Sequence, residues 1–303
     1  MSSEPTGKTA TGEERTASGN GFGIDTWISL KRWLVKTSRS PFVTFSSLVQ
    51  PIIFFVLIAA VLGAVADGVL AEAYSGDVHY VTFLTPAIVI QSALAAAAVS
   101  GIGLVKDMET GMFDTILVSP IDRRAMLLGK VLSEVCRVVV QTLIIVVLGY
   151  LMLRYAAGDS SSVYLRTGVS GIVGIAAVAV LFSLIFMAFS NVVALVTRDE
   201  EATILIANLL TFPLLFISSA FLPLDVLPGW IQRVAVVNPV TYGVDGIRAV
   251  MLDADVMTVF DVTAFTGLWN TVVPAVAVLA LFTIVLGTVA THLLTSAWKA
   301  EVQ

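Results

Sequence analysis

The sequence predicts an all-α membrane protein with six transmembrane helices, and three observations support this fold class. Hydrophobic residues make up 57% of the 303 residues, charged residues make up 13%, and the mean hydropathy is +0.93. A soluble protein of this length would have too little polar surface to cover its core. In addition, six long stretches lack Asp, Glu, Lys and Arg, and basic residues concentrate on one side of them. Three further elements are expected: an N-terminal interfacial helix, a cytoplasmic coupling helix and an outer re-entrant helical hairpin.

The six uncharged stretches set the positions of the spans. An α-helix rises 1.5 Å per residue and needs roughly 20 apolar residues to cross a hydrocarbon core of about 30 Å. We expect spans at about 42–66, 81–105, 131–153, 169–196, 203–222 and 270–294, in one six-span domain over residues 41–299. The third stretch is short unless its helix extends backwards through Arg137, Glu134 and Lys130, whose side chains could snorkel to the cytoplasmic surface.

The basic residues predict the orientation, because Lys and Arg near membrane spans stay on the cytoplasmic side. An even number of spans places both termini on one side. If that side is the cytoplasm of a plasma-membrane protein, it receives thirteen of the 17 basic residues. The four that remain outside are Arg154, Arg166, Arg233 and Arg248. The outer segments also carry many acidic residues, Asp245 among them, which predicts a well-solvated acidic exterior, with adaptation to a salt-rich environment as the alternative.

The N-terminal region is expected to have two parts. Residues 1–25 are rich in Ser, Thr, Gly and Glu and contain no apolar run, which is typical of a disordered cytoplasmic tail and not of a cleavable signal peptide. Asp25 could cap a helix within 26–40 that has Lys36 on a basic face and Trp27 on an apolar face. Such a helix would lie in the membrane interface. The alternative is a cytoplasmic extension of the first span, which Pro41 disfavours.

The segment 106–125, between the second and third spans, is charged and rich in motifs. The run from Ser119 to Asp122 is typical of a capping box, with Pro120 at the first helical position. Before it, Phe113 and Ile116 belong to an apolar stripe beside Asp114. A short amphipathic element of this kind suits a groove on a partner protein. The alternative is a solvated loop that reverses the chain.

The segment 225–252, after the fifth span, predicts two short helices. Asn238 and Pro239 suit the N-cap and first position of a helix, and Pro228 begins another. The pair is apolar, but Arg233 and Arg248 argue against a seventh crossing. Broken helices at membrane depth persist only against protein or a water-filled cavity. We therefore expect a re-entrant helical hairpin at the outer mouth, with a surface loop as the alternative.

The spans contain uncharged polar residues that could contact a transported molecule. Gln91, Asn208 and Thr211 could line a substrate path, or they could hydrogen-bond to neighbouring helices. Three function classes stay open: an ATP-driven transporter, an ion-coupled secondary transporter and a membrane scaffold without transport. The apparent lack of carboxylates inside the spans argues against the ion-coupled class.

Catalytic signatures are weak in this sequence. No Ser-His-Asp arrangement or carboxylate pair stands out, His79 and His292 are far apart in the sequence, and Cys136 is the single cysteine. We therefore expect no enzyme activity, no metal site and no cofactor in this chain. The lipid bilayer is an expected partner, and nucleic acid is not.

Two sets of residues resemble type-2 ABC exporter permeases, the family that includes daunorubicin-resistance, polysaccharide and lipid export permeases. The first set resembles the cytoplasmic coupling region of that family: Glu109, Gly111, Asp114, Ser119, Pro120, Arg123, Gly129 and Lys130. Met112 stands where the family usually has threonine. The second set follows span five: Phe221, Pro223, Leu227, Pro228, Trp230, Asn238, Pro239, Thr241, Tyr242 and Arg248.

The resemblance implies a permease subunit that pairs with an identical or different permease and binds a cytoplasmic ABC ATPase. That ATPase would bind ATP and Mg²⁺, and the substrate would be hydrophobic or amphipathic, such as a drug, a lipid or a glycolipid. The residues implied in ATPase coupling are Glu109, Gly111, Asp114, Pro120, Arg123 and Arg124. The residues implied in an outer gate are Pro223, Pro228, Asn238, Pro239, Tyr242 and Arg248.

Overall fold

The computed structural model describes residues 21–39, 41–73, 78–111, 123–157, 164–260 and 263–301. All regular structure within these ranges is helical, which confirms the all-α prediction. Five of the described helices are long and apolar enough to cross a membrane. They are α2 (Pro41–Ala73), α3 (Tyr80–Glu109), α5 (Arg123–Ala157), α7 (Val169–Thr197) and α11 (Trp269–Glu301).

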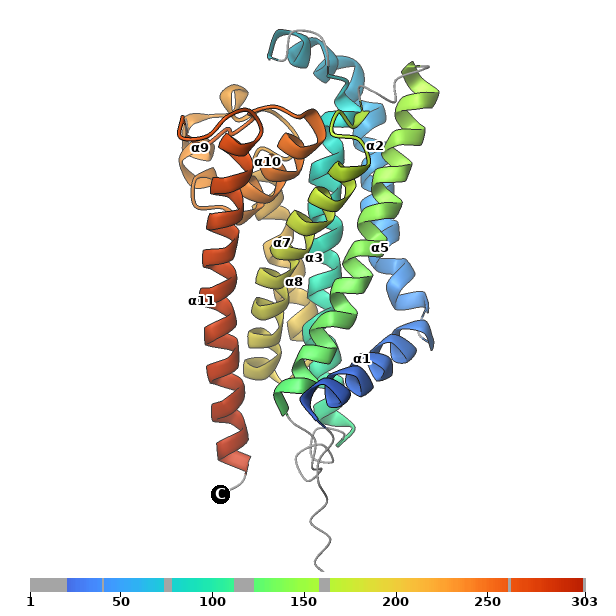
Figure 1. Ribbon diagram of the computed structural model, residues 1–303, viewed down its shortest axis with the longest axis vertical. Coiled ribbons are helices and arrows are strands. Elements are labelled where there is room, and N and C mark those ends of the chain that lie inside the picture. Colours follow the sequence, from blue (N-terminus) through green and yellow to red (C-terminus); the bar gives the residue numbers. More distant parts are fainter. Residues whose placement is uncertain are drawn as a thin grey trace, which may run out of the picture.

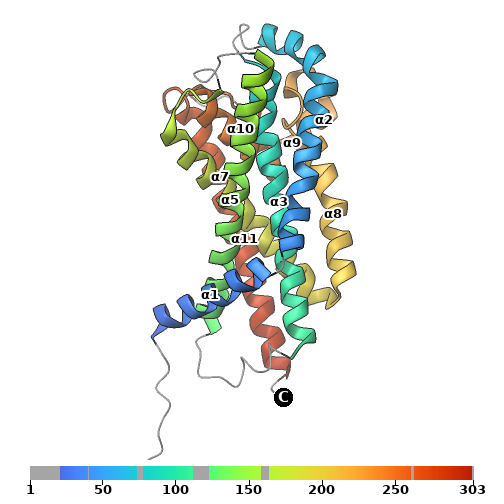
Figure 2. The same ribbon diagram turned by 90° about the vertical axis from the view of Figure 1, so that its right-hand side faces the viewer.

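The remaining described elements are shorter. Helix α1 (Phe22–Arg39) precedes α2, and α8 (Glu200–Phe216) follows α7. Beyond α8 come a 3-10 turn, η1 (Leu224–Val226), and two short helices, α9 (Gly229–Ala235) and α10 (Pro239–Leu252). Helix α1 lies across the end of the bundle at which the C-terminus also lies, and α9 and α10 lie at the other end (Figures 1 and 2).

The fifth expected span, 203–222, differs most from the observed helix. Helix α8 has 17 residues and ends at Phe216, so at 1.5 Å per residue it is about 25 Å long. It ends there because the Asn238 side chain hydrogen-bonds to two carbonyls at this end of the helix. Nδ2 donates to Leu214 O at 2.7 Å and to the carbonyl of the C-cap residue Ile217 at 2.5 Å. Carbonyls at a helix end need such partners. The six-span count therefore depends on α8, the shortest of the six candidates.

The third expected span is one continuous helix, α5, which begins at Arg123 and includes the charged residues that precede the apolar run. The expectation that these side chains snorkel to the surface is wrong for two of them. Lys130 and Glu134 are only 4% and 6% exposed and point into the bundle. The reason is that α3 and α7 supply oxygen partners for the Lys130 ammonium group, so Lys130 is satisfied without water.

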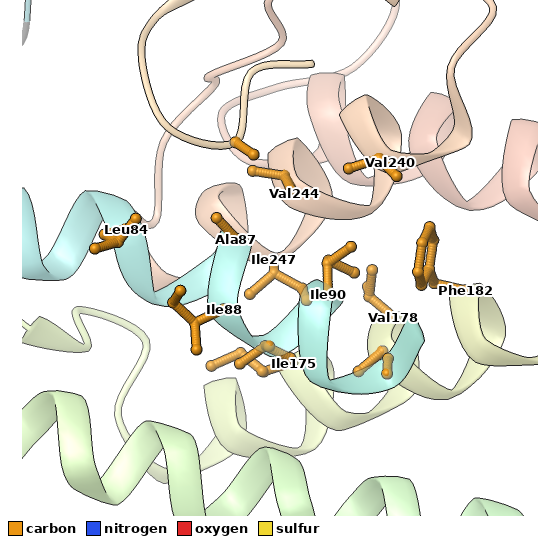
Figure 3. Close-up of a cluster of buried hydrophobic side chains, with 14 of the residues drawn as sticks. Leu84, Ala87, Ile88, Ile90, Ile175, Val178, Phe182, Val240, Val244 and Ile247 are labelled. Carbon is orange, nitrogen blue, oxygen red and sulfur yellow. The ribbon is translucent and has the colours of Figure 1, made fainter. Parts of the chain in front are cut away.

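Helix α3 is the centre of the bundle, and it packs against α7, α5, α2, α8 and α10. Figure 3 shows part of its core, in which Ile88 and Ile90 of α3 lie close to Ile175 and Phe182 of α7 and to Ile247 of α10. Small residues let these helices come close together. A Cβ on Gly101 would lie 2.4 Å from the backbone oxygen of Ser190 on α7. Burying this apolar surface against neighbouring helices fixes the relative positions of the spans.

The N-terminal helix differs from its prediction at its start. Helix α1 begins at Phe22, so Asp25 lies in its first turn and is buried, and it is not the N-cap. Most of the expected tail 1–25 lies outside the described residues. Helix α1 is amphipathic and packs mainly on α5. Its exposed apolar residues, including Trp27 and Leu34, would face lipid in the expected interfacial position.

Candidate functional site

The expected coupling segment is described only at its two ends. Glu109 is the last residue of α3 and is exposed, and Gly111 leaves the helix with a φ of +65°. A left-handed glycine just after a helix is a common helix stop. Asp114 and Pro120 lie outside the described residues. Arg123 and Arg124 form the first turn of α5, but their side chains are not described.

A charged cluster joins α1 to α3 beside this segment. We call it the α1 cluster, and its members are Arg32, Trp33, Lys36, Asp107, Lys130, Glu134 and Arg137. Asp107 accepts from Lys36 at 2.8 Å and from Arg32 at 3.3 Å. Since Asp107 lies two residues before Glu109, these ion pairs tie α1 to the end of α3 from which the coupling segment leaves.

Lys130 is the buried centre of the α1 cluster. Its Nζ donates to Ser100 O at 2.9 Å and to Asn191 Oδ1 at 2.9 Å, and it lies 3.8 Å from Glu134. It also lies 5.7 Å from the centre of the Trp33 ring, over which Lys36 lies at 4.5 Å. Cations over an indole ring are attracted by its negative face. The cluster thus connects α1, α3, α5 and α7.

Gly129, the residue before Lys130, has a steric role. A Cβ at this position would lie 2.5 Å from Ser29 Cβ and 2.7 Å from the backbone nitrogen of Leu30 on α1. Such distances are too short, so only glycine lets α1 approach α5 this closely. The Ser29 hydroxyl then donates to the Met126 carbonyl at 2.8 Å. Gly129 therefore lets α1 pack closely on α5, and Lys130 joins α5 to α3 and α7.

The predicted Asn-Pro corner is present at the other end of the bundle. Asn238 is the N-cap of α10, its Oδ1 accepts from Val240 N at 3.0 Å, and Pro239 is the first helical residue. Tyr242 donates to the Val236 carbonyl at 2.6 Å, which fixes the turn between α9 and α10. Pro223 and Pro228 occupy the N-cap positions of η1 and α9. Asn238 thus joins α8, α9 and α10 at one point.

Arg248 and Asp245 form a buried ion pair on α10, with 3.4 Å between Nη1 and Oδ1. Arg248 Nη2 also donates to the carbonyls of Ser219 at 2.9 Å and Phe83 at 3.3 Å. Asp245 accepts from the Ser219 hydroxyl at 2.6 Å and, through its other oxygen, from the Thr258 hydroxyl at 2.6 Å. We call this group the α10 network.

The expectation of a solvated acidic exterior is wrong at Asp245, and Arg248 is likewise not an exposed outer charge. Both residues are fully buried. Burial raises the pKa of the Asp245 carboxyl above its ordinary value, and Arg248 and the Ser219 and Thr258 hydrogen bonds oppose that rise. A charge can be buried at this cost only when it is paired and hydrogen-bonded. The pair therefore locks α10 to α3 and to the turn after α8.

The three residues expected along a substrate path lie in different surroundings. Gln91 is buried on α3, and within the described part of the chain its amide group has no hydrogen-bond partner. Asn208 is exposed on α8. Thr211 donates to the Ala207 carbonyl of its own helix at 2.8 Å. The structure does not bring these side chains together, and their role in a path stays a prediction.

An apolar cavity of about 510 Å³ lies between α2 and the segment after α8. Nine of its ten lining residues are apolar, and Ser218 is the exception. The walls are Phe54, Leu57, Ile58, Val61 and Leu62 from α2 and Phe216, Ser218, Phe221, Leu222 and Leu227 from the other side. Several of these residues are exposed, including Val61 at 71%, so the cavity opens on the side of the bundle. It can hold an apolar molecule without leaving polar groups unpaired.

Sequence reasoning missed Trp33, Asp107 and Glu134 as members of one site. Their partners come from helices far apart in the chain, so spacing alone could not group them. One signal was present, because the Gly129-Lys130 pair precedes an apolar run and a buried lysine needs oxygen partners nearby. The apolar cavity had no such signal, since its walls have the same composition as a lipid-facing surface.

Comparison with known proteins agrees with these features. Residues 25–252 match the family described as ABC-2 type transporter. The chain is 27% identical over 242 residues to the ycf38 transport permease of Cyanophora paradoxa, covering 78% of each chain. It is 25% identical to the daunorubicin resistance ABC transporter permease protein DrrB1 of Streptomyces coeruleorubidus, covering 73% of each. It is 26% identical to the probable doxorubicin resistance ABC transporter permease protein DrrC of Mycobacterium tuberculosis, covering 78% of this chain and 80% of that protein.

Proposed function

The chain belongs to the ABC-2 type transporter family, and we propose that it is the permease subunit of an ATP-driven exporter of hydrophobic or amphipathic molecules. Relatives named for daunorubicin and doxorubicin resistance support a drug-like substrate. ATP and Mg²⁺ would bind to a separate cytoplasmic ATPase subunit, and this chain would carry out no covalent chemistry.

The observation that carries the proposal is the apolar cavity between α2 and the segment after α8. Its nine apolar lining residues favour a substrate with a large apolar surface. Its lateral opening would let such a molecule leave into the lipid without first crossing water. The cavity lies at the end of the bundle that we propose to be outside, near the Asn-Pro corner.

The coupling step is proposed for the α3 end of the α1 cluster. The ATPase would contact the segment that begins at Glu109 and continues to Arg124, and ATP-driven closure would pull on it. Because Asp107 is ion-paired with Lys36 and Arg32, α1 would move together with this end of α3. Such a mechanism is a coupling free energy between the nucleotide site and the substrate site.

The outer gate is proposed at α9 and α10. Asn238 caps α10 and hydrogen-bonds to the end of α8, so a movement of α8 would act directly on Asn238 and on the turn between α9 and α10. Together with Tyr242 and Pro239, it would form the hinge about which α8 moves while α10 stays in place. Pro223 and Pro228 would set the turns on either side, and Arg248 would hold the fixed side of the gate.

The assembly is proposed to contain two permeases in the plasma membrane, with both termini of each in the cytoplasm. Helix α2 exposes Ile53, Val61 and Val65, and α8 exposes Leu205 and Leu209. These residues are apolar and could face lipid or a second permease, identical or different. With α8 counted as a span, the chain would cross the membrane six times.

An ion-coupled transporter is a second candidate, because one specific observation weakens the sequence argument against it. The expectation that the spans hold no carboxylate is wrong at Glu134, which is buried within α5 in the candidate span Ala125–Tyr155. Intramembrane carboxylates often serve ion coupling. Here, however, Lys130 and Arg137 lie on the same helix, which suits a structural ion cluster better.

Flux through inside-out vesicles tests the proposal. Vesicles containing the permease and its ATPase should accumulate a lipophilic fluorescent dye only with ATP, and an ionophore should leave the uptake unchanged. A Glu109→Lys variant should insert normally but lose most ATP-dependent uptake. Uptake without ATP that an ionophore abolishes would instead establish the ion-coupled candidate, and equal uptake by Glu109→Lys would exclude the coupling role.

A further inference from the structure

A pocket of about 180 Å³ lies between α1, α3 and α5, at the opposite end of the bundle from the apolar cavity. We call it the three-helix pocket. Its lining changes from Val99 and Ile102 to Lys106 along α3, which is where the uncharged run of that helix ends. A change from apolar to basic residues at the end of a span marks the boundary between hydrocarbon and water. The pocket is therefore at headgroup level.

Three buried polar atoms of residues that line this pocket have no hydrogen-bond partner within the described residues: Trp33 Nε1, Arg137 Nε and Glu134 Oε2. Trp33 and Glu134 are only 8% and 6% exposed. Buried polar atoms in proteins are nearly always hydrogen-bonded. Three unpaired atoms around one pocket therefore point to a ligand with both acceptors and donors.

The volume indicates a ligand larger than a single water molecule. One water needs roughly 15 Å³ of such space, far less than the volume of the three-helix pocket. Arg137 is already anchored, because its Nη2 donates to the Ala96 carbonyl at 2.7 Å. Its guanidinium plane is therefore held in place while Nε stays buried without a partner among the described residues.

The charges around the pocket define the chemistry of that ligand. Arg137, Lys36 and Lys106 line the pocket and favour a phosphate group, and the Trp33 indole adds a neutral donor. Glu134 would repel a simple anion, but its unpaired oxygen can accept from an ammonium group. A phosphoethanolamine headgroup carries both groups. A choline headgroup has no N–H to donate, and a glycerol headgroup has no positive charge.

We propose that the three-helix pocket binds the phosphoethanolamine headgroup of a membrane phospholipid. Trp33 and Arg137 donate to its phosphate, Glu134 accepts from its ammonium group, and the acyl chains stay in the hydrocarbon beside the bundle. The bound lipid would hold α1 against α3 and α5 next to the coupling segment. The inference rests on the membrane placement in the proposed function, but not on the substrate or the ATPase.

Native mass spectrometry of the purified full chain tests the proposal. The chain is mixed with equimolar phosphatidylethanolamine and phosphatidylcholine that share the same acyl chains. We expect about a tenfold preference for phosphatidylethanolamine, which corresponds to about 1.4 kcal/mol. Glu134→Gln should bind the two lipids equally. Its matched control is Glu201→Gln, which changes an exposed carboxylate on α8 and should keep the preference.

A second pair of variants tests the phosphate contact and keeps the proposal falsifiable if Glu134→Gln misfolds. Trp33→Phe removes the indole N–H and should weaken the binding of both lipids several-fold. Trp27→Phe, at a residue that is 65% exposed on the same helix, should change neither. Unchanged binding by Trp33→Phe would overturn the phosphate contact.

Three other results would overturn the proposal. Equal binding of both lipids by the unmodified chain would exclude headgroup recognition. Stronger binding of phosphatidylglycerol than of phosphatidylethanolamine would exclude the ammonium contact with Glu134. Equally strong binding of free glycerophosphoethanolamine would identify a soluble ligand instead of a lipid. None of these results bears on export, because the measurement counts bound lipid and not transported dye.

Discussion

The two ends of the bundle both bury charged groups, but they satisfy them differently. In the α10 network, Asp245 accepts from four donors, and Arg248 lies 3.6 Å over the Phe83 ring while donating to two carbonyls. In the α1 cluster, Glu134 and Trp33 keep unpaired atoms beside an open pocket. A network with this many partners around one ion pair fixes one geometry, whereas a cluster with several unpaired atoms beside a pocket can accept a ligand or a moving partner. We therefore regard the α10 end as the fixed end and the α1 end as the adjustable end.

The largest effect is expected from Arg248→Met in the α10 network. Removing the guanidinium leaves Asp245 buried without its counter-charge, and such a change typically costs about 3–5 kcal/mol. Denaturant unfolding of the purified protein in detergent measures the loss. The double variant Asp245→Asn/Arg248→Met should recover part of it, because no unpaired charge remains. Equal losses in the single and double variants would contradict the ion-pair explanation.

A smaller loss is expected from Lys130→Met in the α1 cluster. It removes hydrogen bonds to Ser100 and Asn191, and we expect a net loss of about 2–3 kcal/mol, because the ammonium group is then no longer buried and Arg137 stays as a counter-charge for Glu134. The matched control is Lys106→Met, whose side chain is 59% exposed and pairs with Glu200 at 3.6 Å. The control should cost below about 1 kcal/mol. If Lys130→Met costs more than Arg248→Met in the same unfolding measurement, the ranking of the two ends is wrong.

Gly129→Ala should disturb the contact between α1 and α5. The new Cβ would overlap the α1 backbone, and overpacking of this kind costs about 1–3 kcal/mol. Hydrogen exchange should show faster exchange in α1 while α10 stays protected. Gly287→Ala is the control, since a Cβ there meets nothing within 4 Å. Uniform destabilisation of both ends would show that the contact is not local.

The last comparison, and the most local in its effect, is at Asn238, at the corner between the fixed end and α8. Asn238→Ala removes an N-cap worth about 1–2 kcal/mol and the two donors to the end of α8. Asn238→Ser keeps an N-cap oxygen but loses those donors, so it should cost less for α10 while still releasing α8. Unfolding and hydrogen exchange of α8 separate the two contributions. Identical results for both variants would exclude a separate contact with α8.

Much of the fold was accessible from the sequence because the membrane imposes length and charge rules that a single sequence carries. The uncharged runs predicted helices at α2, α3, α7 and α11, and the Asn238-Pro239 pair predicted the start of α10. The end of α8 was not accessible, since it depends on a side chain 21 residues away from Ile217. Hydropathy cannot detect a helix that is stopped by a tertiary hydrogen bond.

The candidate site was accessible only in part for a similar reason. Motifs located Glu109, Gly129 and Lys130, because these positions have local signatures. The burial of Asp245 and Arg248 could not be predicted, since charged residues outside a span are usually solvated. The same holds for the grouping of Trp33 with Glu134, which needs the packing of α1 on α5. Local patterns identify the elements, and tertiary contacts decide which of their side chains meet.

The central claim is that this permease works with a separate ATPase, and co-purification tests it most directly. The chain would be tagged, purified from its native membrane in mild detergent, and assayed for a co-purifying protein with vanadate-sensitive ATPase activity. We predict that such a protein is present and that Glu109→Lys reduces its recovery while leaving the permease folded. Its repeated absence from intact, folded preparations would contradict the account and favour the ion-coupled candidate or a scaffold.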